Sequence, residues 1–371
     1  MVMYIHFRKD WTEFKWDSGI LLPYVSKARE LQGRLIGRME GIGFKLREEA
    51  VLYTLTEDIV KSSEIEGEIL NPEEVRSSVA RRLGMDISGL PEANRDVEGV
   101  VAMMMDATQN FQLELTKTRM CGWHNALFPT GYSGLYKITV AQYRGNKDGP
   151  MQVVSGAMGK ERVHYVAPEA DRLETEMNKF IEWFNANDSM DSLIKSAIAH
   201  LWFVSIHPFD DGNGRMARAI GDKQLARADK TNQRFYSMSS QISKHKKGYN
   251  NMLEATQKGN MDVTTWLVWY LERLIESLEV TNETLSKILL KAKFWENHQQ
   301  TQFNARQLHM VNKLQDDFYG KLSSSKWAKM NNVTSRTALN DIEDLMQKGV
   351  LKPTEEKGRS TNYVLILPVL E

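Results

Sequence analysis

The chain has 371 residues, with 48 Lys and Arg against 48 Asp and Glu, so its formal net charge is zero. This balance excludes a strong overall field that would draw the protein to nucleic acid or to an anionic membrane. The single cysteine, Cys121, excludes a disulfide within the chain and favours a reducing compartment. The N-terminus lacks the pattern of a signal peptide and no run of 18 apolar residues occurs, so we expect a cytoplasmic protein without a membrane span.

Helical periodicity dominates the N-terminal third of the chain. One of these helices opens with Asn71 as N-cap, Pro72 at the first position and Glu74 reaching back in a variant of the capping box. The sequence Gly-Leu-Pro at 89–91 predicts a break. The predicted helices cover residues 18–43, 46–66, 71–84, 91–109 and 116–127.

The helix over 46–66 has an apolar face that ends in polar residues. Leu52, Leu55, Ile59, Ser62 and Glu66 follow spacings of 3, 4, 3 and 4, which places them on one side of the helix. An inward carboxylate is costly unless a cation pairs with it. Two interpretations of Glu66 stay open, a paired inward carboxylate or a frayed helix end in water. Glu64 lies off this face, and we expect it to point to solvent.

The pattern changes between residues 131 and 168, where glycines alternate with short β-rich pieces such as Met151–Ser155 and Val163–Val166. This region predicts a long loop that carries a hairpin. Pro168 is expected to start a helix that ends near residue 185. Residues 191–206 are apolar almost all round and predict the buried central helix of the domain. Further helices are expected over 213–227, 240–257 and 262–294.

The last part of the chain predicts helices over 304–317, 324–331 and 335–347, followed by extended pieces at Val350–Pro353 and Asn362–Leu367. This order predicts a winged helix. Its DNA-reading residues would be Ser335, Arg336, Thr337 and Asn340 on the second helix, with Lys357 and Arg359 on the wing. The same helix carries Asp341, Glu343 and Asp344, and residues 301–371 hold only ten Lys and Arg against eight Asp and Glu. DNA binding therefore stays open beside protein interaction or dimerisation.

Residues 207–218 read His-Pro-Phe-Asp-Asp-Gly-Asn-Gly-Arg-Met-Ala-Arg. Pro208 disfavours α geometry for the residue before it, so the central helix should end at His207 and present its imidazole. With a pKa near the reference value, His207 would serve as a general base. Phe209 is expected to anchor the segment in the core. Asp211 could hold Mg²⁺ together with phosphate oxygens.

The second half of this segment predicts an anion site. Gly212, Asn213 and Gly214 open a new helix, whose first N–H groups are free to bind phosphate. Arg215 and Arg218 lie three positions apart on one face, so both can reach a polyphosphate.

The segment resembles the signature of the Fic family, His-Pro-Phe-x-(Asp/Glu)-Gly-Asn-Gly-Arg-x-x-Arg, at every fixed position. The resemblance implies a mainly helical bundle of the Fic type with a β-hairpin flap. It implies an enzyme that transfers AMP from ATP to a Ser, Thr or Tyr hydroxyl of a target protein, with self-modification and a homodimer left open. In such an enzyme His207 is the base, Asp211 holds Mg²⁺, and Gly212, Asn213 and Gly214 cradle the α- and β-phosphates. Arg215 and Arg218 would bind the outer phosphates, with Arg218 at the γ-phosphate.

Two further regions are similar to parts of this family. Residues 131–168 resemble its flap, in which Val153, Val154, Ser155 and Gly156 stand where nucleotide and target are contacted. Tyr249 stands where relatives place a tyrosine against the adenine, and Gln257 stands where some relatives carry an asparagine.

The string Ser62-Ser63-Glu64-Ile65-Glu66-Gly67 resembles the family's inhibitory motif, (Ser/Thr)-x-x-x-Glu-(Gly/Asn). The resemblance implies that Glu66 pairs with Arg218 and blocks the γ-phosphate site, as in the subclass whose inhibitory helix precedes the catalytic core. We therefore expect three domains: a helical region over 1–110, the catalytic core over 111–294 and the winged helix over 295–371.

Two alternative functions stay open. In the first, the protein is a DNA-binding regulator and the Fic module is a sensor. In the second, the module transfers another group, such as phosphocholine, from a different donor, or it removes AMP from a modified protein. Phosphate transfer is disfavoured, because relatives with that activity usually have lysine at the position of Gly214.

Overall fold

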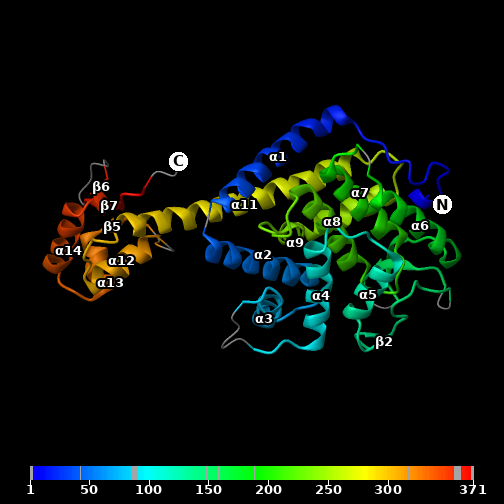
Figure 1. Cartoon of the computed structure of the whole chain (residues 1–371), viewed down its shortest axis with the longest axis horizontal. Helices are drawn as coiled ribbons and strands as arrows, with labels where there is room; N and C mark the ends of the chain where they lie inside the picture. Colours follow the sequence, from blue (N-terminus) through cyan, green and yellow to red (C-terminus); the bar gives the residue numbers. More distant parts are fainter. Residues whose placement is uncertain are drawn as a thin grey trace. The chain divides into compact units, whose positions relative to one another are not determined.

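The computed structural model describes residues 3–41, 43–85, 91–146, 149–156, 159–187, 189–315, 318, 320–354 and 361–368. The chain divides into two compact units, Met1–Thr281 and Asn282–Glu371. One helix, α11 (Thr264–Asn297), runs across the boundary between them (Figure 1). Among the described helices, none is both long and apolar enough to cross a bilayer. The domain limits expected at residues 110 and 294 stay predictions.

Helices form most of the first unit, as the periodicity predicts. Besides α11 they are α1 (Ser18–Glu40), α2 (Phe44–Ile65), α3 (Pro72–Arg82), α4 (Arg95–Gln109), α5 (Lys117–Leu127), α6 (Leu173–Asn185), α7 (Ser192–Ile206), α8 (Asn213–Asp229), α9 (Met238–Lys244) and α10 (Lys246–Gln257), with the 3-10 turns η1 (Ile5–Phe7) and η2 (Ala170–Arg172). Two small antiparallel hairpins accompany them, β1 (Tyr132–Ser133) with β2 (Tyr136–Lys137) and β3 (Gln152–Ser155) with β4 (Arg162–Val166).

Some boundaries differ from the sequence prediction for local reasons. The helix expected over 240–257 is broken at His245, whose backbone (φ −110°, ψ 26°) leaves the helical region between α9 and α10. The helix expected from Pro168 begins only at α6, after η2. Glu74 reaches back to Asn71 as predicted, but it meets the side chain of Asn71: one carboxylate oxygen accepts from Asn71 Nδ2 at 3.4 Å, and the other accepts the backbone N–H of Asn94 at 3.1 Å. Asn94 in turn caps α4 by accepting the Val97 N–H at 3.0 Å.

The core of the first unit is built around α7. Each residue from 193 to 206 is buried, as expected for a helix that is apolar on all sides. Its main neighbour is α8, which follows it in sequence and lies beside it (Figure 1). The connection between the two helices is the segment that begins at His207, so the packing of α7 on α8 fixes both ends of that loop.

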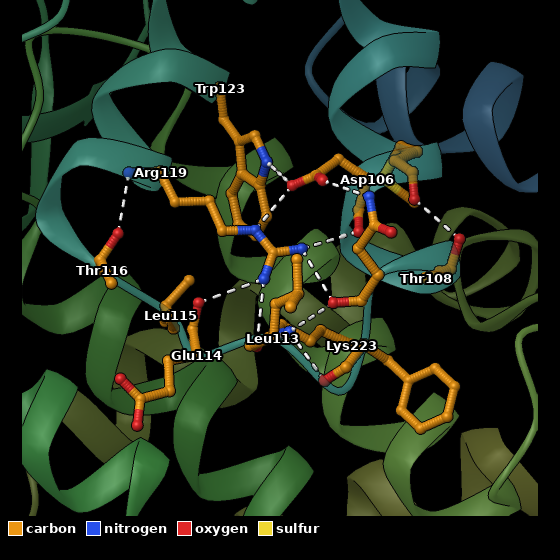
Figure 2. Close-up of polar contacts among 12 residues, drawn as sticks. Asp106, Thr108, Leu113, Glu114, Leu115, Thr116, Arg119, Trp123 and Lys223 are labelled. Atoms are coloured by element: carbon orange, nitrogen blue, oxygen red, sulfur yellow. Dashed lines mark hydrogen bonds and ion pairs between the residues drawn. The ribbon is translucent and has the colours of Figure 1, made fainter.

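Figure 2 shows the polar contacts that hold the turn between α4 and α5 against α8. Arg119 of α5 pairs with Asp106 of α4 through Nε at 2.6 Å. Lys223 of α8 donates to a set of backbone carbonyls, those of Asn110, Phe111 and Leu113, at 3.1, 2.8 and 2.6 Å. Carbonyls past a helix C-terminus need donors, and here a buried cation supplies them. The middle of α8 is thereby fixed to its neighbours.

A second buried polar cluster holds α2 in place. Asp58 of α2 accepts the Ser237 hydroxyl at 2.5 Å and the Ser239 N–H at 3.0 Å. Arg234 pairs with Asp222 of α8 at 2.7 Å. Burial, followed by the nearby Asp58 carboxyl, raises the pKa of Asp222 well above its usual range. The middle of α2 is therefore held by groups that have lost contact with solvent.

The second unit contains α12 (Ala305–Gln315), α13 (Ser324–Asn331) and α14 (Ser335–Gln347), with β5 (Leu322–Ser323), β6 (Leu351–Pro353) and β7 (Asn362–Leu365). The strands form an antiparallel sheet in the order β5-β7-β6. Its core includes Trp327 and Ile342, both fully buried. Helix, turn, helix and paired strands follow one another as expected, while Lys357 and Arg359 lie outside the described residues. The assignment as a winged helix stays a prediction.

Candidate active site

His207 stands where the central helix ends. Helix α7 stops at Ile206, and His207 takes a left-handed backbone conformation (φ 52°, ψ 58°), which is rare for a residue with a side chain. Its Nδ1 lies 3.2 Å from the carbonyl oxygen of Val204. A carbonyl can only accept, so Nδ1 carries the proton and Nε2 keeps a free lone pair. The loop thus presents a neutral imidazole with its basic nitrogen available.

The pKa of His207 differs from the sequence expectation. Burial, assisted by the charge of Arg144, lowers the pKa of His207 from 6.5 to about 4. The prediction that His207 titrates near its reference value is therefore wrong, because burial cannot be inferred from the local sequence. The imidazole is unprotonated over the whole physiological range, and a base needs that state.

The loop that follows is held by side chains on both sides. Phe209 is fully buried, as predicted. Asn213 closes the loop, because its side chain accepts the Phe209 N–H at 3.0 Å and donates to the Phe209 carbonyl at 2.8 Å. The amide of Asn213 is thus used within the loop, which leaves its backbone N–H as the group that could meet a phosphate.

Two residues that sequence reasoning missed support this loop. His124 stacks on Phe209 with ring centroids 4.3 Å apart, and its Nε2 lies 3.2 Å from the Asp211 carbonyl oxygen. Arg144 donates through Nε to the His207 carbonyl at 2.8 Å. Both residues act on the backbone of a distant segment, and no pattern in their own neighbourhood points to it.

Asp211 presents its carboxylate at the start of α8. One oxygen accepts the Gly212 N–H at 2.6 Å, and the other accepts the hydroxyl of Ser133 from the β1–β2 hairpin. Within the described residues, no three His, Cys, Asp or Glu side chains gather around a common metal position. Mg²⁺ is often held by one carboxylate together with substrate phosphates. The site fits such an ion, because the Ser133 hydroxyl can rotate away from its oxygen.

Gly214 lies directly under the carboxylate of Glu66. A Cβ built on residue 214 would come within 2.0 Å of Glu66 Oε1. Without a Cβ on residue 214, the Glu66 carboxylate can lie where it does; a larger residue there would displace it. The carboxylate therefore occupies the N-terminal end of α8, where the helix dipole and the first N–H groups favour an anion.

The structure brings together the residues of the string from 62 to 67 and the last arginine of the signature segment. Arg218 Nη1 lies 2.8 Å from Glu66 Oε1. The Arg218 guanidinium also donates through Nε to the Ser62 hydroxyl at 2.8 Å and through Nη2 to the Ser62 carbonyl at 2.7 Å. The inward face of α2 continues to Ser62, which is fully buried, while Glu64 is exposed and pairs with Lys61 at 2.6 Å.

Arg215 has an acidic partner that the sequence did not point to. Its Nη1 pairs with the carboxylate of Glu68, and its guanidinium stacks over the Phe128 ring at 5.1 Å. Arg215 and Arg218 are both buried at the start of α8. Two carboxylates from the end of α2 thus meet the two arginines of α8.

Tyr249 and Gln257 lie on α10, and both are buried. The Tyr249 hydroxyl is 2.8 Å from His200 Nε2, and Gln257 donates to the Ser205 hydroxyl at 3.2 Å. Burial is the main cause that raises the pKa of Tyr249, and the charge of Arg218 opposes this shift. The phenol therefore lies close to the Arg218 guanidinium. The Tyr249 hydroxyl and the Gln257 Nε2 thus bond to α7, and the Tyr249 ring packs against Trp266 and Trp269.

The expected flap is the β3–β4 hairpin. Val153 and Val154 are exposed on β3, and Gly156 follows the strand with φ +108°. The Ser155 hydroxyl lies 2.5 Å from His164 Nε2, and His164 Nδ1 lies 2.5 Å from a Glu254 oxygen. This chain of hydrogen bonds joins both strands of the hairpin to α10.

The comparison with protein families agrees with these findings. The model of the Fic/DOC family matches residues 114–225, which include the loop after α7 and the start of α8. A second model, a domain of unknown function (DUF4172), matches residues 4–85, which include α2.

Curated relatives share part of the chain. The protein adenylyltransferase Fic of Drosophila willistoni is 28% identical over 173 residues, which cover 46% of this chain and 32% of that protein. The protein of the same name from Nematostella vectensis is 39% identical over 66 residues, 17% of this chain and 16% of that one. The chain thus spans less than half the length of these relatives.

Solved structures share the fold. A Fic family protein from Desulfovibrio desulfuricans G20 superposes with a TM-score of 0.54 at 20% identity and covers 96% of this chain and 98% of its own. A Fic domain containing signaling protein from Bacteroides thetaiotaomicron reaches a TM-score of 0.51 at 18% identity over 70% of this chain and 98% of its own. These likenesses show the fold, and residues 114–225 match the Fic/DOC family model, so this part of the chain is a Fic/DOC domain.

Proposed function

We propose that this protein transfers AMP from ATP to a hydroxyl side chain of a target protein, and that Glu66 holds the enzyme inactive. The observation that carries the proposal is one arrangement at the start of α8. A neutral His207 stands before a helix N-terminus that holds buried Arg215 and Arg218. The relatives named protein adenylyltransferase support the reaction class.

The chain's own groups can perform each step of this reaction. The target hydroxyl gives its proton to His207 Nε2 while its oxygen attacks the α-phosphorus of ATP. The bond from the α-phosphorus to the bridging oxygen breaks, and pyrophosphate leaves. Backbone N–H groups of Asn213 and Gly214 would hold phosphate oxygens, and Arg215 and Arg218 would neutralise the outer phosphates. Catalysis then rests on positioning and charge neutralisation.

Mg²⁺ would be held by Asp211 together with the phosphates, and it would supply charge neutralisation on the leaving pyrophosphate. Ser133 shares the Asp211 carboxylate, so its hydroxyl has to turn away or join the ion when the ion binds.

The target would be aligned by the exposed edge of the β3–β4 hairpin. An extended peptide can add a strand to such an edge through backbone hydrogen bonds. Val153 and Val154 lie on that strand with 36% and 48% of their surface exposed. Their side chains would contact the target near the residue to be modified.

The proposal is tested by intact mass. Wild type, Glu66→Gly and the double variant Glu66→Gly/His207→Ala are incubated with ATP and Mg²⁺, alone and in a cell lysate. We expect added AMP with Glu66→Gly and almost none with the other two. Modification that persists in the double variant would exclude His207 as the base, and no modification by Glu66→Gly would refute the inhibited transferase.

One observation keeps DNA binding by the second unit as a second candidate. Asp341 pairs with Arg306 at 2.8 Å, and Asp344 pairs with Lys348. Two of the three acids of α14 are thus paired within the unit, which leaves its net charge unchanged, while Arg336 at the start of the helix is exposed and could contact a phosphate. A gel shift that disappears on deletion of residues 301–371 would support this function, and its absence in the full chain would oppose it.

A further inference from the structure

The end of α2 places two glutamates by a fixed backbone turn. The Glu68 N–H donates to the Ser63 carbonyl at 3.0 Å, and the Gly67 N–H donates to the Glu64 carbonyl at 3.0 Å. These two bonds define a Schellman motif, which needs a left-handed residue after the helix. Gly67 supplies it with φ +89°. The chain therefore turns sharply between Glu66 and Glu68, and the position of Glu68 is fixed by the helix itself.

The turn directs the two carboxylates to two different arginines. Glu66 Oε1 lies 2.8 Å from Arg218 Nη1, and Glu68 Oε2 pairs with Arg215 Nη1. Arg215 and Arg218 are three positions apart on α8, so their guanidinium groups share one face of the helix. Both arginine side chains are at most 3% exposed, whereas the two glutamates keep about a third or more of their surface in water, 36% and 44%. The glutamates therefore enter the arginine site from the solvent side.

Glu68 is held there against unfavourable surroundings. Burial raises the pKa of Glu68 most, and Asp211, Glu66 and Asp96 add to this shift, while Arg215 opposes it. A carboxylate among three other acids would leave this position unless a cation held it. Arg215 is the cation that it contacts, and the same guanidinium would bind a phosphate oxygen through the same nitrogen.

We infer that Glu68 is a second inhibitory carboxylate, which competes with a phosphate group of the nucleotide for Arg215 while Glu66 competes for Arg218. This inference rests on the proposed function. The two acids mimic two adjacent phosphates, so the end of α2 occupies the polyphosphate site at two points. Removal of one carboxylate would leave the other in place.

The test measures ligand binding separately from catalysis. In the His207→Ala background, which prevents turnover, calorimetry gives the affinity for ATP and for inorganic tripolyphosphate, both with Mg²⁺. The variants are Glu66→Gln, Glu68→Gln and the pair of them, with Glu64→Gln as the matched control. Glu64 is exposed, pairs with Lys61 and contacts neither arginine in the described structure, so it reports the effect of one lost negative charge at this turn; glutamine can still accept the Ser243 hydroxyl that lies 3.1 Å from Glu64.

We expect Glu66→Gln/Glu68→Gln to bind both ligands about 3- to 10-fold more tightly than Glu66→Gln, since a partly exposed ion pair contributes about 1 kcal/mol. Glu68→Gln alone should gain less, because Glu66 still covers Arg218. Glu68→Asp keeps the charge but is shorter by one methylene, so its affinity for both ligands should lie between those of the protein with Glu68 and of Glu68→Gln. Equal affinity of the double variant and Glu66→Gln would overturn the inference, as would an equal gain from Glu64→Gln.

The same variants, with His207 restored, separate this inference from the proposed reaction. If they bind as expected but transfer no AMP, the second carboxylate stands and the reaction assignment fails. If Glu66→Gln transfers AMP, but adding Glu68→Gln to it changes neither ligand affinity nor transfer rate, the reaction stands and Glu68 is not inhibitory. Circular dichroism of each variant confirms that it is folded.

Discussion

The carboxylate of Glu66 fills the space above Gly214 and at the same time pairs with Arg218 at 2.8 Å. The Glu66 side chain thus uses both features that would let the start of α8 bind an anion, the bare backbone of a glycine and a buried guanidinium. A nucleotide phosphate that bound there would need the same two groups.

Removal of Glu66 should therefore raise activity. We expect Glu66→Gly to transfer AMP about 5- to 150-fold faster than wild type, the range of a coupling free energy of about 1–3 kcal/mol. Transfer of label from ATP to protein measures the rate. Glu64→Gln, which neutralises an exposed glutamate of the same turn without placing a glycine in the helix, should stay at the wild-type rate. A similar increase in both variants would point to loosening of the helix end instead of loss of the ion pair.

Gly214→Ala tests the contact without reference to activity. The added methyl would displace the end of the Glu66 side chain and with it the partly exposed ion pair with Arg218, so we expect it to lower the free energy of unfolding by up to about 1 kcal/mol. In the Glu66→Gly background the clash is gone, and alanine should be neutral or stabilising by up to about 1 kcal/mol. Urea unfolding of the four proteins gives the double-mutant cycle. An equal loss in both backgrounds would show that residue 214 does not face Glu66.

The pH dependence of the reaction should reflect the lowered pKa of His207. A base acts in its unprotonated form, and burial lowers the pKa of His207 to about 4. Activity of Glu66→Gly should therefore persist at pH 5.5 and decline only as the pH approaches about 4. Removal of Glu66 also removes a nearby negative charge that raises this pKa, so the variant should not titrate at higher pH. A half-maximal rate near pH 6.5 in the pH profile would contradict the assignment.

Acid should destabilise the fold well above the pH at which most carboxylates titrate. Burial lowers the pKa of His6 and His124 to about 4 and that of His200 to about 3. The folded state keeps these residues neutral, whereas the unfolded state binds protons below pH 6.5, so stability falls as the pH drops from about 6.5 to 4. Thermal unfolding between pH 7.5 and 4 measures this slope. His6→Asn should reduce it, because asparagine does not titrate, and an unchanged slope would exclude His6 as a contributor.

The hydrogen bonds of His164 should matter for the protein target more than for the nucleotide. His164 joins Ser155 to Glu254 and so holds the β3–β4 hairpin on α10. In the Glu66→Gly background, we expect His164→Ala to slow the modification of protein several-fold, because one hydrogen bond to a charged group is lost. The affinity for ATP should change little. His309→Ala, an exposed histidine in α12, is the control. Loss of ATP affinity in His164→Ala would place this residue at the nucleotide instead.

Much of the fold and of the candidate site could be predicted because it is local in sequence. The uniform apolarity of residues 191–206 predicts a buried helix, and Pro208 predicts its end. The spacing from Leu52 to Ser62 predicts the inward face of α2, and these residues are buried. The segment 207–218 keeps its chemistry within one loop and one helix turn, so its composition alone points to an anion site.

The rest depends on contacts that distant segments make. Glu68 follows a glycine outside the helix and belongs to no periodic face, so nothing in its neighbourhood points to Arg215. His124 and Arg144 support a loop by binding backbone carbonyls, which leave no mark in the sequence. The pKa of His207 is set by burial, and this burial arises only when the loop folds onto its neighbours.

The anchoring of α2 limits how the proposed inhibition could be relieved. Asp58 holds the middle of the helix through Ser237 and Ser239, inside a cluster that also contains the ion pair of Arg234 and Asp222. Lifting the whole helix would break the hydrogen bonds of Asp58 with Ser237 and Ser239 and remove its carboxyl from this buried cluster. Unwinding the last turn breaks only the bonds of residues 62–68. If α2 inhibits as proposed, an activator would act by local unfolding at the C-terminal end of this helix, and a ligand bound to its middle would have no such effect.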